Sequence, residues 1–303
     1  MPLAAMDEIT GPARAARAGV GAFNVISIEH AEAIVAGAEA APAPVVLQIS
    51  ENCVAYHGAL APIASACLAI ARLATVPVAV HLDHASAVPL VEAAAELGLG
   101  SVMYDASRLP YADNVRSTAA VAAWCHQRGV WVEAELGEIG GKDGVHAAGA
   151  RTDPAEAARF TAATGIDALA VAVGSSHAML TRDAVLDHGL ISAIGHAVSV
   201  PLVLHGSSGV PDRELTAAVR AGMTKVNIAT QLNKVFTAAV RRTLSDQPAT
   251  VDPRKYGAAG RDAITLEVTR LLRLLGGAGG SLEMSAGTRA QAGGTGEPLS
   301  AVE

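Results

Sequence analysis

The chain has few aromatic side chains and few charged ones. Of its 303 residues, 3% are aromatic and 17% are charged, whereas 51% are hydrophobic. We therefore expect a core of Ala, Val, Leu and Ile, and the apolar content argues against global disorder. The net charge of −7 is the wrong sign for a nucleic-acid partner or an anionic membrane.

Cysteines and long apolar runs are also scarce. Cys53, Cys67 and Cys125 are odd in number and lack the spacing of metal ligands, so we expect reduced, structural thiols. No stretch approaches the roughly 18 uninterrupted apolar residues of a membrane helix, and no charged leader precedes an apolar run at the N-terminus. These features predict a soluble, cytoplasmic protein with no membrane partner.

Eight short apolar runs are separated by longer, Ala-rich segments with helical periodicity. Several runs are apolar at four or five successive positions, which is typical of parallel strands covered on both faces. The predicted strands are 21–27, 44–50, 76–84, 100–105, 129–136, 167–174, 200–206 and 224–230. The predicted helices include 30–41, 59–73, 87–97, 112–127, 154–163, 212–221 and 231–245. Helix starts are predicted at Thr152-Asp153-Pro154 and Val210-Pro211-Asp212.

Eight β-then-α units in a chain of this length predict an α/β protein, a (β/α)8 TIM barrel formed by one domain over 1–276. The alternative is an open, doubly wound sheet with two extra strands. A last helix is predicted at about 256–275. The Gly- and Ala-rich segment 277–303 has no apolar period, and we expect it to be a disordered tail.

Side chains capable of chemistry follow the predicted strands, at ends that share one face of a barrel. His84, His177 and His205 occur at three separate strand ends. Three histidines with an open fourth position are typical of a catalytic zinc. The other histidines on predicted helices or in loops are interpreted as structural: His30, His57, His126, His146, His188 and His196.

A glycine- and serine-rich loop follows the seventh predicted strand. It reads His205-Gly206-Ser207-Ser208-Gly209 and precedes a predicted helix. Its backbone amides and the helix N-terminus could bind an anion, and barrels commonly bind phosphate between strands seven and eight. This loop favours a phosphorylated substrate.

Together these segments resemble the class II, metal-dependent fructose-bisphosphate and tagatose-bisphosphate aldolases. The resemblance covers about 10–275 and includes, in order, GAFNV, HLDH, DASRLP, VEAELG, TDP, VGSSH, LVLHGSSGVPD, KVNIAT and DPRKY. It implies cleavage of a ketose bisphosphate to dihydroxyacetone phosphate and glyceraldehyde 3-phosphate, and a homodimer or homotetramer. A zinc ion bound to the carbonyl oxygen of the substrate would stabilise the negative charge that develops during cleavage.

The resemblance also implies roles for individual residues. His84, His177 and His205 would bind the catalytic zinc, and Asp83 would remove the C4 hydroxyl proton. Asp105 and Glu135 match acidic positions that hold a second metal in some members. Substrate contacts are implied for Asn24, Ser50, Gly206, Ser208, Asn227, Thr230 and, reaching a neighbouring subunit's active site, Arg254.

Four positions depart from the family pattern or match it only loosely. Ala178 replaces the glycine that usually follows the strand-six histidine, and Asp143 is the nearest match to a proton-shuttling loop glutamate. The basic residue expected beyond that histidine is Arg182. Ala229 resembles tagatose-type members, whereas fructose enzymes place aspartate there.

Alternative functions follow from the same residues. A metal-dependent hydrolase could use the same barrel, although the anion-binding loop disfavours it. A non-catalytic paralogue that binds metal and sugar phosphate, or an aldolase of another phosphorylated ketose or keto acid, would fit the departures. A Schiff-base aldolase is disfavoured because none of the four lysines, Lys142, Lys225, Lys234 and Lys255, ends the sixth predicted strand.

Overall fold

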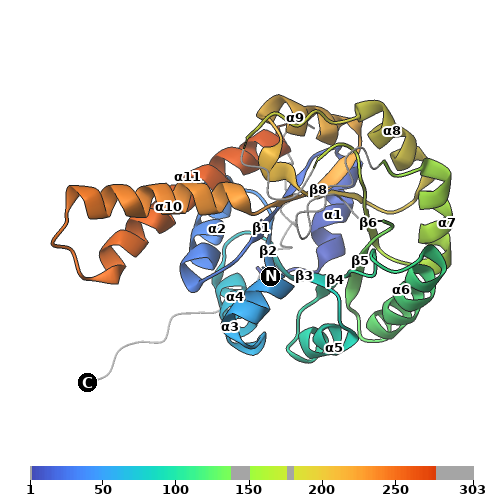
Figure 1. The fold of residues 1–303 in the computed structure, drawn as a ribbon, viewed down its shortest axis with the longest axis horizontal. Coiled ribbons are helices and arrows are strands. Elements are labelled where there is room, and N and C mark those ends of the chain that lie inside the picture. The colour runs from blue at the N-terminus through green and yellow to red at the C-terminus, as the bar shows by residue number, and fades with distance from the viewer. Residues whose placement is uncertain (1, 138–150, 176–180, 278–303) are drawn as a thin grey trace, which may run out of the picture.

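A computed structural model describes residues 2–137, 151–175 and 181–277. Eight parallel strands form a closed barrel in the order β1 to β8, ringed by helices (Figure 1). The predicted TIM barrel is therefore confirmed, and the open doubly wound sheet is excluded. The strands are β1 (Val20–Asn24), β2 (Val45–Ser50), β3 (Val78–Ala85), β4 (Ser101–Tyr104), β5 (Trp131–Glu135), β6 (Ala168–Ala170), β7 (Leu202–Leu204) and β8 (Met223–Ile228).

The helices on the outside of the barrel mostly match the predicted ones. They are α2 (Ile28–Ala40), α3 (Glu51–His57), α4 (Ala61–Leu73), α5 (Val88–Glu96), α6 (Tyr111–His126), α7 (Pro154–Thr164), α8 (His188–Ala197), α9 (Asp212–Ala221), α10 (Thr230–Asp246) and α11 (Pro253–Gly276). Asp153 caps α7 as expected, accepting from Glu156 N at 2.8 Å. At α9, Pro211 is itself the cap residue, so it does not lie in the first turn.

Several predicted boundaries are wrong at the carboxyl ends of the strands. β6 ends at Ala170, four residues before the predicted end, and β7 and β8 end at Leu204 and Ile228. The residues just beyond β6, Val171, Ala172 and Val173, are apolar because they are buried, although they lie outside the strand. Apolar character therefore extends further than strand pairing here.

The additional helix α1 (Met6–Ala15) closes the amino-terminal end of the barrel. Met6, Ile9 and Ala13 pack against the first residues of neighbouring strands, including Val20 and Val46. Since that end is blocked by apolar packing, polar side chains inside the barrel face the carboxyl ends of the strands.

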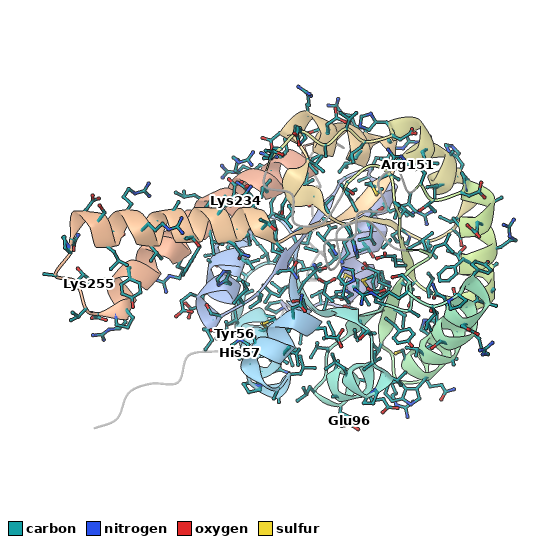
Figure 2. All side chains as sticks on the ribbon, in the orientation of Figure 1. Tyr56, His57, Glu96, Arg151, Lys234 and Lys255 are labelled. Carbon is teal, nitrogen blue, oxygen red and sulfur yellow. The ribbon has the colours of Figure 1, made fainter. Side chains whose placement is uncertain are left out.

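Helices α10 and α11 form a hairpin that extends away from the barrel (Figure 1). Lys255 lies near its far end, and Lys234 lies closer to the barrel (Figure 2). Cys53, Cys67 and Cys125 are buried and form no disulfide, as expected. The predicted tail lies outside the described residues apart from Gly277. Among the described helices, no single one is long and apolar enough to cross a membrane, and one bent pair, α3 with α4, passes that test together.

Candidate active site

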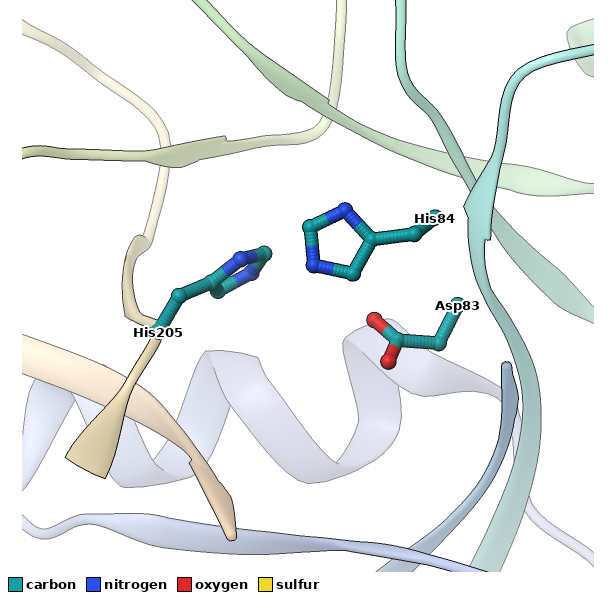
Figure 3. A group of neighbouring side chains, drawn as sticks. All are labelled: Asp83, His84 and His205. Atoms are coloured by element: carbon teal, nitrogen blue, oxygen red, sulfur yellow. The ribbon is translucent and has the colours of Figure 1, made fainter. Parts of the chain in front are cut away.

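A bulge at the end of β3 brings two consecutive side chains into the same site. The register between β3 and β4 shifts between Leu82 and Ala85, and His84 has φ 54°, in the left-handed region. Successive side chains on a regular strand point to opposite faces, and bulges locally change that direction. Asp83 and His84 therefore both face His205 (Figure 3).

Two histidine rings at this site are each oriented by a carboxylate. His84 Nδ1 lies 2.7 Å from Asp105 Oδ2, and His205 Nε2 lies 2.9 Å from Glu133 Oε1. With these nitrogens donating, the lone pairs are on His84 Nε2 and His205 Nδ1. The rings lie edge to face with centroids 4.7 Å apart. Carboxylate-oriented imidazoles of this kind are typical of metal ligands.

Asp83 is buried and held in one orientation. Asn24 Nδ2 donates to its Oδ2 at 3.0 Å, whereas none of the described residues hydrogen bonds to its Oδ1. Burial opposes ionisation, but the nearby His84, His205 and Lys225 lower the pKa of Asp83 well below its usual range. Asp83 is thus a carboxylate with one oxygen oriented and the other directed toward the site.

The buried histidine His205 is neutral at neutral pH. Burial lowers its pKa to about 4, although the hydrogen bond to Glu133 raises it. A neutral imidazole is the form that binds metal. Ligand atoms of Asp83, His84 and His205 lie within 4.8 Å of one another, and so do those of His84, Asp105 and Glu135.

The charge of the site also fits a cation. Asp83, Asp105, Glu133 and Glu135 are nearly inaccessible to solvent. Lys225 pairs with Glu133 at 2.9 Å. Buried carboxylates are costly unless their charge is compensated, and a divalent ion would provide that compensation. The donor set and its charge are therefore suited to zinc.

The predicted substrate-binding residues mostly converge on one cavity of about 200 Å³. It opens beside Asp83 and His84, and its further lining includes Asn24, Ser50, Gly206, Ser208, Asn227, Ala229 and Thr230. The loop over Ser207–Gly209 forms a turn of 3-10 helix, with Gly206 at φ 66°. Together with the N-terminus of α10 at Thr230, this backbone can donate hydrogen bonds to a phosphate.

Two predicted substrate-binding arginines lie away from this cavity. Arg182 donates to Val210 O at 2.7 Å and pairs with Asp212 at 2.6 Å, so its guanidinium holds the start of α9. Arg254 is exposed near the tip of the α10–α11 hairpin and pairs with Asp252. Asp143, His177 and Ala178 lie outside the described residues.

A polar layer lies beneath the cavity, and sequence reasoning assigned no role to its residues. Gln48, His81, Glu133 and Lys225 are completely buried inside the barrel, on β2, β3, β5 and β8. His81 Nδ1 lies 2.9 Å from Ser101 Oγ, and burial, reinforced by the charge of Lys225, lowers the pKa of His81 to about 3. A polar residue inside an otherwise apolar strand, as in VVLQIS, was the available signal.

A larger cavity of about 980 Å³ opens at the opposite end of the barrel, beside α1. Its lining includes Arg14, His126 and Asp167. His126 Nε2 and Asp167 Oδ2 lie 2.8 Å apart, and Arg14 donates to carbonyl oxygens. Active sites of TIM barrels form at the carboxyl ends of the strands, so the smaller cavity is the candidate active site.

Known proteins resemble the chain over nearly its whole length. The sequence profile described as "Fructose-bisphosphate aldolase class-II" matches residues 4–280. The fructose-bisphosphate aldolase of Geobacillus stearothermophilus is 39% identical over 283 residues, covering 92% of this chain and 99% of that protein. The corresponding enzyme of Giardia intestinalis is 35% identical over 305 residues, with 92% and 94% covered.

A solved structure agrees with these sequence relatives. The YdjI aldolase from Escherichia coli K12 matches with a TM-score of 0.80 at 31% identity, covering 91% of this chain and 98% of that one. The chain therefore belongs to the class II fructose-bisphosphate aldolase family, a family of zinc-dependent lyases that act on phosphorylated sugars.

Proposed function

We propose that the chain catalyses reversible, zinc-dependent cleavage of fructose 1,6-bisphosphate to dihydroxyacetone phosphate and glyceraldehyde 3-phosphate. The observation that carries this proposal is the convergence of Asp83, His84 and His205 within 4.8 Å at the cavity that contains the glycine- and serine-rich loop. A metal site beside an anion-binding loop suits a phosphorylated ketose. The names of the relatives support the same substrate.

The zinc would be held by His84 and His205, with His177 as the third ligand. When bound, zinc supplies a Lewis acid that stabilises negative charge on the substrate's carbonyl oxygen. Asp105 and Glu133 orient the two histidines. In members that bind a second cation, the matching positions are those of Asp105 and Glu135, and this pair lies close to His84 here.

Asp83 would act as the general base during cleavage. Its Oδ1 takes the proton from the C4 hydroxyl as the C3–C4 bond breaks, and returns it in the direction of synthesis. Asn24 holds Oδ2, so the carboxylate keeps its orientation while the proton moves. The low pKa of Asp83 favours the ionised, proton-accepting form before substrate binds.

The remaining cavity residues would bind the rest of the substrate. The amides of the loop after Gly206 and the N-terminus of α10 would hold one phosphate. Arg254 would bind the other phosphate in a neighbouring copy of the chain, which requires a homodimer or homotetramer. The position of Arg254 on a projecting hairpin supports this assignment.

The test is to incubate protein of known zinc content with fructose 1,6-bisphosphate and, separately, tagatose 1,6-bisphosphate, with and without a chelator. We expect chelator-sensitive release of triose phosphate, faster from the fructose compound. Faster cleavage of the tagatose compound would mean that the enzyme prefers the C4 configuration of tagatose, in line with the resemblance of Ala229 to tagatose-type members. If protein with one zinc per chain cleaves neither sugar, the proposed function is wrong.

A further inference from the structure

Lys225 lies inside the barrel, beneath the candidate active site, and is completely buried. Its ammonium group donates three hydrogen bonds: to Gln48 Oε1 at 2.5 Å, to Asn227 Oδ1 at 2.8 Å and to Glu133 Oε2 at 2.9 Å. An ammonium has three donors and no acceptor, so all of its capacity is used. One side chain thereby fixes groups on β2, β5 and β8.

The bond to Gln48 determines how Asp83 is held. Because Gln48 presents its oxygen to Lys225, its Nε2 is available to donate, and it does so to Asn24 Oδ1 at 3.3 Å. Asn24 then presents its own Nδ2 to Asp83 Oδ2 at 3.0 Å. Each hydrogen bond from Lys225 to Asp83 is therefore donated in the same direction. If the side-chain amide of Gln48 or Asn24 were rotated by about 180°, an oxygen would face another oxygen.

The hydrogen bond from Lys225 to Asn227 determines which atom of Asn227 is available to a ligand in the cavity. With its Oδ1 bound to Lys225, Asn227 is left with Nδ2, which is buried and meets no hydrogen-bond acceptor among the described residues. Asn227 lines the cavity. A buried donor without a protein acceptor is costly unless a ligand or water satisfies it. Lys225 thus makes this position a donor, which suits phosphate or hydroxyl oxygens.

The bond to Glu133 determines the state of His205. Glu133 Oε2 accepts from Lys225, while its Oε1 lies 2.9 Å from His205 Nε2. A carboxylate only accepts, so His205 Nε2 carries the proton and Nδ1 carries the lone pair. Lys225 and His205 thus each occupy one oxygen of Glu133, which fixes the orientation of that side chain.

We propose that Lys225 is a positioning residue that sets the hydrogen-bond direction of Gln48, Asn227 and Glu133, and through them orients the base, a substrate contact and a zinc ligand. This rests on the proposed aldol cleavage, because that reaction gives Asp83 and His205 their roles. Lys225 itself touches neither the substrate nor the reacting atoms. A Schiff base is unnecessary to explain a lysine inside this barrel.

The test requires variants that separate positioning from folding. Lys225→Met alone would leave the Glu133 carboxylate buried without its ammonium partner, which destabilises a protein strongly. The double variant Lys225→Met with Glu133→Gln removes both charges together. Gln48→Met is milder, because it interrupts only the path to Asp83 and leaves Lys225 bound to Glu133 and Asn227. Val268→Ala in α11 is a control that lowers stability far from this network.

The proposal predicts a different kinetic signature for each variant. For Gln48→Met we expect kcat to fall by about 10–100-fold, with KM and zinc content as in the wild type, because orienting partners commonly have effects of that size. For the double variant we expect kcat to fall and KM to rise, and calorimetry should show weaker binding of dihydroxyacetone phosphate. Val268→Ala should lower the melting temperature and leave kcat and KM unchanged.

The possible results separate the positioning role of Lys225 from the proposed function. If Gln48→Met keeps kcat within twofold of the wild type, or the folded double variant keeps both kcat and KM, the positioning role is wrong. If the double variant does not fold, Gln48→Met still tests the path to Asp83. If the wild type cleaves no bisphosphate, the proposed function fails, and binding of dihydroxyacetone phosphate still tests whether Lys225 sets the direction of Asn227.

Discussion

Adjacent residues of β3 are assigned different tasks, although both lie near the metal site. Asp83 and His84 each offer an atom within 4.8 Å of His205, so distance alone would allow either to bind a metal ion. Their hydrogen bonds differ. His84 is oriented by the carboxylate of Asp105, as metal-binding histidines commonly are, whereas Asp83 is oriented by the amide of Asn24. This difference favours His84 as the ligand and Asp83 as the base.

Asp83→Ala tests that division. We expect the variant to retain zinc and lose cleavage, with kcat reduced by about 10²–10⁴-fold, the usual contribution of a general base. Zinc would be measured by atomic absorption and cleavage by triose phosphate release. His84→Ala is the matched variant and should lose zinc. Loss of zinc from Asp83→Ala as well would instead make Asp83 a ligand.

The sequence predicts the reactive residues at strand ends better than the residues that orient them. His84, Asp105, Glu135 and His205 all lie at or just beyond strand ends, because that position follows from the fold. The contact between Gln48 and Lys225 was not predicted, since the two residues lie 177 positions apart in the chain and only barrel closure brings them together. The bulge at His84 was also missed, because no residue in HLDH requires a positive φ.

At the scale of helices and strands, periodicity predicted all eight strands but missed short or unusual helices. α1 contains Gly11 and Pro12, which are poor helix formers, yet it forms because Met6 and Ile9 are buried against the barrel. α3 has seven residues, which is too short for a clear period. Tertiary packing rather than local preference stabilises both helices.

Close packing of α2 on α11 gives a test at the same scale. A Cβ on Gly37 would lie 2.7 Å from Val268 Cβ and 2.9 Å from the backbone oxygen of Thr265. We expect Gly37→Ala to lower the free energy of unfolding by about 1–3 kcal/mol, the usual cost of overpacking. Urea unfolding followed by circular dichroism would measure it.

Gly11→Ala is the matched control, since no heavy atom lies within 4 Å of a Cβ placed there in α1. That change should stabilise the chain by about 0.5–1 kcal/mol, because alanine favours helices more than glycine does. Equal effects of the two substitutions would mean that α2 and α11 separate more easily than their packing indicates.

At the scale of the whole molecule, the barrel concentrates apolar packing at one end and negative charge at the other. α1 and the strand starts form an apolar layer, whereas the side chains of Asp83, Asp105, Glu133 and Glu135 are buried near the opposite end. Lys225 compensates one of these carboxylates. Stability of the entire barrel should therefore depend on an ion at the catalytic end.

Removal of zinc should lower the melting temperature as well as abolish cleavage. A ligand that binds only the folded state stabilises it by about 2.7 kcal/mol at one hundred times its dissociation constant. We expect a chelator to lower the melting temperature by several degrees, and added zinc to restore it. In His84→Ala the chelator should have a much smaller effect, because a ligand is missing. If stripping the wild type of zinc leaves its melting temperature unchanged, the buried carboxylates are compensated within the protein itself.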